Sequence, residues 1–262
     1  MDPRIRRRRV EVRRQEGRHR LRMLVAGSAV VITGCAGWGA TRSPLFDLDH
    51  VVVDGASHIS ADQVRAASGL RRGQPLTDVE RESVAAAVGA LPWVQEATVA
   101  RHWPSSVTIR LTERAPIAAT AAAGSGFALV DRSGVVVDHV AGMPPGLVAL
   151  TGLPPAGSPG SHLSAEGVAT LTVAVALPSS LIARTAGVTP APGGREVELH
   201  LAPEGTVRLG PPEDLAKKFD AIATMLARVD LRNLAVLDVR RPESPVLTRR
   251  ETPTKVSTQR TG

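Results

Sequence analysis

A charge-free segment near the N-terminus constrains this chain more than any other feature. Residues 23–41 contain no Asp, Glu, Lys or Arg, and as a helix they would span roughly 28 Å at about 1.5 Å per residue. Residues 1–22 hold Asp2, Glu11 and Glu16 against Arg at positions 4, 6, 7, 8, 9, 13, 14, 18, 20 and 22. Because basic flanks stay on the cytoplasmic side, this pattern predicts a transmembrane helix over 23–41 behind a cytoplasmic tail.

Two alternatives to an uncleaved anchor stay open for this segment. A cleaved signal peptide has a similar charge pattern, but no A-x-A site followed by a mature start precedes Arg42. The run Ile32-Thr33-Gly34-Cys35 matches the apolar-small-Cys pattern of a lipoprotein processing site. We expect the anchor, with residues 43–262 outside the cytoplasm and Cys35 as a small apolar residue in the helix.

The basic charge belongs to the tail alone. The chain has 32 Lys+Arg and 25 Asp+Glu. Residues 1–22 account for ten of the basic and three of the acidic residues, so the rest of the chain has 22 basic and 22 acidic residues. The rest of the chain is therefore neutral and has no electrostatic reason to bind nucleic acid. Six aromatic residues, with no Tyr, cannot form stacking platforms for single strands. One cysteine excludes a disulfide framework and a multi-cysteine zinc site.

Residues 45–114 predict a compact β-α-α-β-β unit. A strand over 51–53 ends at an Asp-Gly turn, and capping-box patterns at 60–63 and 77–80 predict the starts of two helices. A strand over 94–100 follows. The closing strand alternates strictly, with three apolar residues facing inward: Val107, Ile109 and Leu111.

Residues 115–242 predict a second, mixed unit, so the fold class is α+β. Ser164 caps a helix whose predicted buried face is Val168, Leu171, Thr172 and Val175. A loop over 187–194 precedes strands over 197–201 and 207–209. The next helix starts at Asp214 and carries the apolar stripe Leu215, Phe219, Ile222, Leu226 and Val229. A last strand over 236–240 follows, and residues 248–262, which lack an apolar pattern, predict a disordered tail.

Several motifs in this order resemble the FtsQ/DivIB family of bacterial cell-division proteins. The first unit carries Leu-Pro-Trp-Val at 91–94, Val-x-Arg-x-Trp-Pro at 99–104 and Glu-Arg-x-Pro at 113–116, which is similar to the family's POTRA domain. The second unit carries Leu-Val-Asp-x-x-Gly-Val-Val at 129–136 and Leu-Asp-Val-Arg-x-Pro at 237–242, which is similar to its β-domain.

The resemblance implies a domain order. It is a cytoplasmic Arg-rich tail over 1–22, a single transmembrane helix over 23–41, a POTRA domain over 45–114, a β-domain over 115–242 that ends in helix and strand, and a partner-binding edge with a disordered tail over 243–262. It also implies a single-pass protein of the plasma membrane at the division septum, with its C-terminal domains extracytoplasmic.

No motif in the chain points to catalysis. The seven His form no H-E-x-x-H pair and none lies near a Cys ligand, and the sequence lacks G-x-S-x-G, G-x-x-x-x-G-K-S/T and G-x-G-x-x-G. We therefore expect no enzyme activity, no cofactor, no metal and no small-molecule substrate.

Binding through surfaces is what remains. The resemblance implies a scaffold that links early division proteins to FtsB- and FtsL-like partners and influences septal peptidoglycan synthesis, with FtsB paired to the end of the β-domain. By position, that contact corresponds to Arg240, Arg241, Ser244, Val246 and Leu247. Pro242 and Pro245 lack an N–H, so pairing must be interrupted there. The alternatives are a solvated strand end for these residues, and another POTRA-type chaperone for the whole chain.

Trp103 and Arg101 have two interpretations. Both could contact a membrane-proximal partner, or Trp103 could pack over the POTRA helices while Arg101 lines a strand. We expect packing. The Arg-rich tail likewise could bind anionic lipid or a cytoplasmic protein, but setting topology is a sufficient role.

Overall fold

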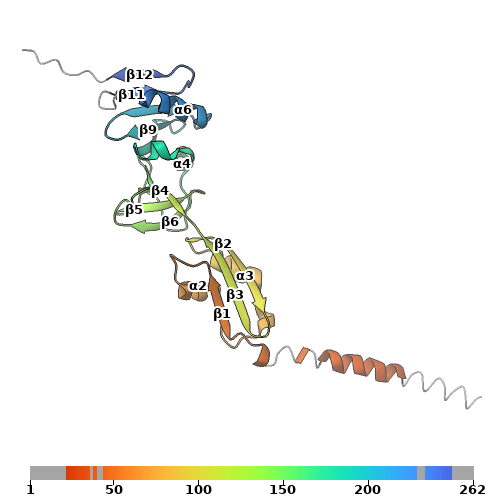
Figure 1. Cartoon of the computed structure of the whole chain (residues 1–262). Helices are drawn as coiled ribbons and strands as arrows, with labels where there is room; N and C mark the ends of the chain where they lie inside the picture. The colour runs from red at the N-terminus through yellow and green to blue at the C-terminus, as the bar shows by residue number, and fades with distance from the viewer. Residues whose placement is uncertain (1–21, 36–37, 40–43, 229–233, 250–262) are drawn as a thin grey trace, which may run out of the picture. The chain divides into compact units, whose positions relative to one another are not determined.

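The computed structural model describes residues 22–35, 38–39, 44–228 and 234–249 (Figure 1). Residues 22–35 form a helix whose side chains are all exposed. This helix covers part of the span expected over 23–41; residues 36–37 and 40–41 of that span lie outside the described residues, as does the tail over 1–21. Within the described ranges, no helix combines the length and the apolar character that crossing a membrane requires.

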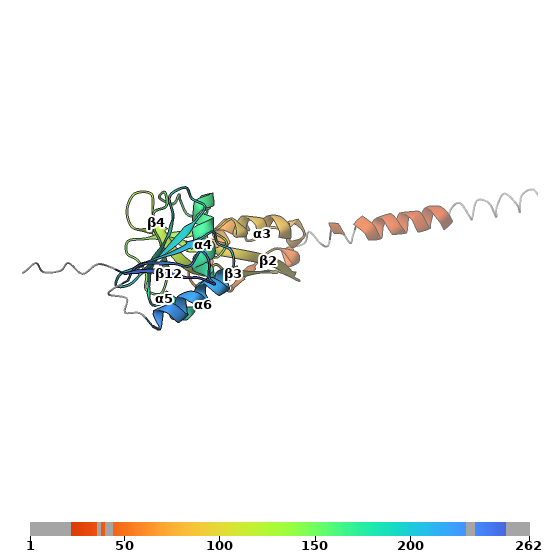
Figure 2. The ribbon, with the colours of Figure 1, turned by 90° about the horizontal axis from the view of Figure 1, so that it is seen from above.

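The remaining chain forms two compact units, which are described one by one. Of the described residues, the first comprises 44–88 together with 97–111, and the second comprises 89–96, 112–228 and 234–249. The elements of the first unit and its border are η1 Pro44–Phe46, β1 His50–Asp54, α2 Ala61–Ser68, η2 Leu76–Asp78, α3 Arg81–Gly89, β2 Val94–His102 and β3 Ser106–Glu113. Its sheet has the order β1-β3-β2, with β1 parallel to β3 (Figure 1). Helix α3 runs alongside β2 and β3 (Figure 2). The predicted β-α-α-β-β order is confirmed.

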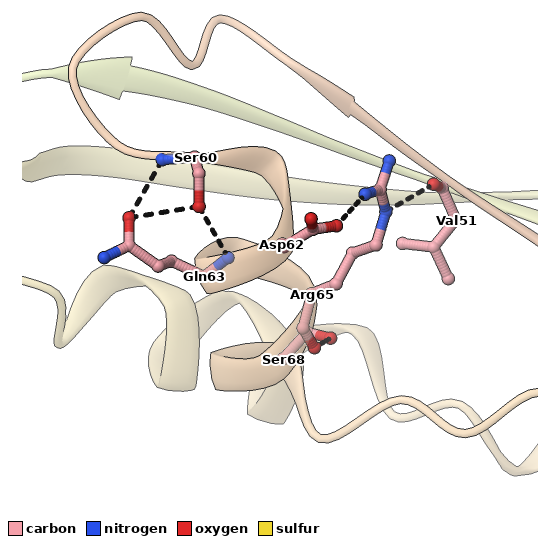
Figure 3. A network of polar contacts seen from close by, with 6 residues as sticks. All are labelled: Val51, Ser60, Asp62, Gln63, Arg65 and Ser68. Carbon is pink, nitrogen blue, oxygen red and sulfur yellow. Dashed lines mark hydrogen bonds and ion pairs between the residues drawn. The ribbon is translucent and has the colours of Figure 1, made fainter.

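The capping box at the start of α2 is formed as predicted. The Gln63 backbone N–H donates to Ser60 Oγ at 3.1 Å, and the Ser60 backbone N–H donates to Gln63 Oε1 at 2.9 Å (Figure 3). This exchange satisfies two of the donors that a helix N-terminus leaves without partners.

The second predicted capping box, at 77–80, is wrong. Thr77 lies in the 3-10 turn η2 and its Oγ1 donates to Asp78 Oδ1 at 3.1 Å, so it caps no helix. Val79 is extended and buried, and α3 begins only at Arg81. Burial of the Val79 side chain holds the chain extended at the point where the sequence pattern alone favours a helix start.

Trp103 also departs from expectation. Its side chain is 54% exposed and makes an edge contact with Phe46 of η1, with the ring centroids 5.6 Å apart, in place of the expected packing over the helices. Arg101 lies in β2, as expected, and donates from Nη1 to the carbonyls of Leu76 and Thr77, both at 3.4 Å. The alternation of β3 is confirmed, since Val107, Ile109 and Leu111 are buried.

The second unit is built on one large sheet. Its elements are β4 Pro116–Ala121, β5 Phe127–Asp131, β6 Val136–Val140, β7 Val148–Leu150, α4 Ala165–Ala176, α5 Ser179–Ile182, β8 Thr185–Pro190, β9 Val197–Leu201, β10 Thr206–Gly210, α6 Leu215–Leu226, β11 Leu234–Asp238 and β12 Val246–Arg249. The nine strands have the order β12-β11-β10-β9-β8-β7-β4-β5-β6. One apolar cluster joins this sheet to α4, α5 and α6.

Two predictions for this unit are corrected. The first half of the loop expected over 187–194 belongs to strand β8, which pairs with β7 and β9 in the middle of the sheet, whereas residues 191–194 form no strand. In α4, Leu171 is buried as predicted, but the other buried residues are Gly167, Thr170, Val173 and Ala174, while Val168 is 47% exposed and Thr172 is exposed. Gly167 lets the first turn of α4 lie close to the loop that precedes it, since a Cβ at this position would be 3.0 Å from Leu163 Cβ.

Helix α6 follows its predicted stripe, with Phe219, Ile222 and Leu226 buried. Val229 lies outside the described residues. The same face also buries Lys218, whose Nζ donates to the Pro211 carbonyl at 2.8 Å. Lys218 thereby ties α6 to the loop that follows β10.

Candidate interaction surface at the C-terminal edge

The last strand of the chain forms one edge of the large sheet. β12 pairs antiparallel with β11, so that Val246 lies opposite Asp238 and Leu247 opposite Leu237. In the part of the chain that the structure describes, β12 has a neighbouring strand on one side only. Thr248 and Arg249 belong to this strand, so the tail predicted from 248 onwards is wrong at these two positions; residues 250–262 lie outside the described ranges. Pairing with β11 holds these two residues in a strand, although the local sequence lacks the apolar pattern that would predict one.

The opposite edge of the sheet, β6, is covered by the chain itself. The Val136 N–H donates to the Ser161 carbonyl and the Gly160 N–H donates to the Val136 carbonyl, both at 2.8 Å. Nε2 of His139 lies 2.9 Å from the Gly157 carbonyl oxygen. The loop after β7 therefore occupies the β6 edge at Val136 and beside His139, whereas in the described residues β12 keeps an edge to which a partner strand could add.

A cavity of about 450 Å³ lies beside the start of β12. It is lined by Glu196, Pro211, Asp238, Arg240, Arg241, Ser244 and Val246. Four of the five residues predicted to bind a partner meet at this cavity. The fifth, Leu247, is half-buried and packs against the core, as expected for a strand residue that faces away from Val246.

Arg240 is held in place by Asp238. Its Nη2 lies 2.7 Å from Asp238 Oδ2, its Nε donates to both carboxylate oxygens at 3.0–3.1 Å, and its backbone N–H donates to Oδ1 at 3.0 Å. The hydrogen bond from Arg240 holds the pKa of Asp238 below its usual range against the opposing effect of burial, and Asp238 raises the pKa of Arg240. Both groups are partly exposed, so the pair fixes geometry more than it adds stability.

Gly210 makes room for the Arg240 side chain. Its φ is +70°, and a Cβ at this position would lie 2.9 Å from Arg240 Cγ. The glycine at the end of β10 therefore allows the arginine stem to lie across the strand end and present its guanidinium to Asp238.

The surface combines an exposed apolar residue with charges of both signs. Val246 is 61% exposed, next to the basic Arg240 and Arg241 and the acidic Asp238 and Glu196. Such a surface suits a protein segment that pairs along β12 from Val246 onwards, since Pro245 has no N–H to donate. Sequence reasoning missed Asp238, Glu196 and Pro211 as lining residues. For Asp238 a signal existed, because residues 238 and 240 point to the same side of an extended chain.

The geometry offers no metal centre in the described ranges, where no group of three or more His, Cys, Asp or Glu is placed to hold an ion.

Comparison with known proteins agrees with the two-unit arrangement. Residues 46–114 match the family described as POTRA domain, FtsQ-type, and residues 119–240 match the C-terminal domain of cell division protein FtsQ/DivIB. The chain is 30% identical over 231 residues to cell division protein FtsQ of Streptomyces coelicolor, covering 85% of this chain and 86% of the relative. It is 30% identical over 244 residues to that of Streptomyces bingchenggensis, covering 89% and 90%. Identity to that of Corynebacterium glutamicum is 28% over 206 residues, covering 78% and 90%. The C-terminal match ends at Arg240, before β12.

Proposed function

Because the chain belongs to the FtsQ/DivIB family of cell division proteins, we propose that it is a non-catalytic scaffold of the division machinery. It links early division proteins to an FtsB–FtsL pair and through that pair influences septal peptidoglycan synthesis. Residues 23–41 anchor it in the plasma membrane by one pass, with residues 1–22 cytoplasmic and both folded units extracytoplasmic at the septum.

One observation carries this proposal: in the described residues the β6 edge of the large sheet is occupied at Val136 by the loop after β7, and β12 has a neighbouring strand on one side only. Main-chain groups on an open edge recruit a partner strand, and neighbouring side chains select which strand. At β12 the selecting residues are Arg240, Arg241, Ser244 and Val246, with Asp238 holding Arg240 in position. Leu247 contributes by packing β12 onto the core.

The test is co-purification from native membranes with the full chain as bait. Val246→Asp places a negative charge, which is costly to desolvate, at the start of the edge strand, while Val168→Asp makes the same change at an exposed position of α4 in the same unit. We expect FtsB- and FtsL-like proteins to follow the wild-type and V168D baits, and recovery to fall about tenfold with V246D.

A bait truncated after Arg241 removes β12 altogether and should recover neither partner. Equal recovery with V246D and V168D would reject β12 as the contact while leaving the division role intact. Absence of both partners from a well-expressed wild-type bait in dividing cells would contradict the scaffold role itself.

A further inference from the structure

The free edge of β1 in the first unit carries a second surface, separate from β12. The His50 N–H donates to the Ser105 carbonyl at 3.2 Å, on the β3 side. The backbone N–H and C=O groups of successive strand residues point alternately to the two edges of the strand. Since those of His50 point toward β3, those of Val51 and Val53 point to the opposite edge. In the described residues β1 pairs with β3 alone, so this edge has no partner strand.

Two arginines occupy carbonyls on this edge. Arg65 of α2 donates from Nε to the Val51 carbonyl at 3.3 Å, and Arg72 donates from Nε to the Asp49 carbonyl at 2.9 Å. Figure 3 shows the Arg65 guanidinium between Asp62 and Val51. An added strand needs those carbonyls as acceptors, so the guanidinium groups obstruct regular strand pairing.

The same arrangement favours an acceptor-rich ligand. The edge still offers the N–H groups of Val51 and Val53, and the two guanidinium groups add further donors in a planar fork that matches a carboxylate. A cavity of about 500 Å³ runs along this edge and is lined by both arginines, with Leu70 and Val51 as apolar contacts. Two acidic groups lie nearby: Asp62 pairs with Arg65 at 2.6 Å, and Asp49 lines the cavity.

The charges of the two terminal segments of this chain indicate that the ligand belongs to another molecule. Residues 1–21 carry nine Arg against three acidic residues, and residues 250–262 carry Arg250, Lys255 and Arg260 against Glu251. Both terminal segments are therefore basic, and neither complements a groove that presents guanidinium and N–H donors. We propose that the groove between β1 and α2 binds an acidic, extended segment of a partner protein, with its carboxylates on Arg65 and Arg72 and its carbonyls on the Val51 and Val53 N–H groups.

The test is hydrogen exchange, measured by mass spectrometry over residues 50–54 of the full chain, with an all-glutamate peptide as probe. This local readout separates the groove from the Arg-rich tail, which also attracts the probe. Arg65→Ala with Arg72→Ala removes the two guanidinium groups, and Arg71→Ala with Arg81→Ala removes equal charge from the same unit outside the groove. Wild type and the control pair should show exchange slowed about tenfold by the probe, and R65A/R72A should show none.

Three results would overturn the proposal. The first is that an all-glutamine peptide slows exchange as much as the all-glutamate peptide, which indicates ordinary strand addition. The second is that R65A/R72A and R71A/R81A change the protection equally. The third is that anionic vesicles protect residues 50–54 where the peptide does not. Arg65 and Arg72 are exposed, so R65A/R72A should retain the wild-type unfolding midpoint. If it does not, Arg72→Gln alone carries the comparison, with the same expected loss of protection.

Discussion

Nη1 of Arg114 lies 2.7 Å from Oδ2 of Asp131, at the turn between β5 and β6. Asp131 also accepts from the Ser133 and Val135 backbone N–H groups, both at 2.9 Å. Its side chain is 8% exposed and that of Arg114 is 18% exposed. Asp131 therefore organises a turn and fixes the residue that precedes β4, which is a structural task for a carboxylate that, from the sequence alone, could be mistaken for a catalytic acid.

Replacing Asp131 by Asn should destabilise the second unit by about 3 kcal/mol, because Arg114 then keeps a buried charge without its carboxylate. Urea unfolding followed by circular dichroism measures the loss. Asp220→Asn, at an exposed position of α6, is the matched control and should change the midpoint little. A D131N midpoint equal to that of D220N would show that the pair is dispensable.

The same pair predicts how stability depends on pH. Burial opposes ionisation of Asp131, but the hydrogen bonds from Arg114, Ser133 and Val135 outweigh it, so the pKa of Asp131 lies below its usual value. A carboxyl with a lowered pKa stabilises the fold fully above its unfolded-state pKa of about 3.9, and this contribution is lost as pH falls through the folded-state value. The difference in unfolding free energy between wild type and D131N should therefore be constant near neutral pH and shrink below about pH 4. A difference that is independent of pH down to pH 2 would contradict the assignment.

Gly210→Ala should destabilise the chain by about 2 kcal/mol, since the new Cβ adds backbone strain and meets Arg240 Cγ. In a background with Arg240→Ala the contact is absent, and the loss should fall by about 1 kcal/mol. Unfolding of the four variants in one double-mutant cycle measures this coupling. Strict additivity would mean that the glycine serves only the backbone conformation.

The anchor predicts a chain that keeps its N-terminus. Intact-mass measurement of the protein from native membranes should give the full chain including residues 1–22. The Cys35→Ser variant should differ from wild type only by the mass of one sulfur replaced by one oxygen, and the fraction of protein found in the membrane should stay the same. A mature protein that begins at Cys35 and carries lipid would instead establish the lipoprotein alternative.

The sequence correctly predicted the features that depend on residues close together in the chain. The Ser60 capping box, the alternation of β3 and the stripe on α6 depend on residues within a few positions of one another, and all three are present. It missed β8, where Gly187 and Pro190 suggest a loop but pairing with β7 and β9 holds the chain extended. Of the buried face predicted for α4, Leu171 is buried, but Gly167 is buried in place of Val168 because it packs against Leu163 of the preceding loop, a contact that the pattern of the helix alone does not indicate.

The candidate site shows the same division. Arg240, Arg241, Ser244 and Val246 were predicted by family position, and they gather at one cavity. Their support comes from residues distant in sequence, namely Gly210, Pro211 and Glu196, which only the fold brings to the end of β11.

The covered β6 edge limits how far the large sheet can extend. A strand can add beside β12, but in the described residues the loop over 157–163 already bonds the main chain of Val136 at the far edge, so a second strand cannot pair along the full length of β6. Open-ended assembly requires two free edges on each copy, whereas one free edge permits either a single partner strand or one twofold pair. Within the described residues this sheet therefore favours one added strand, at β12, and a one-to-one contact over open-ended assembly.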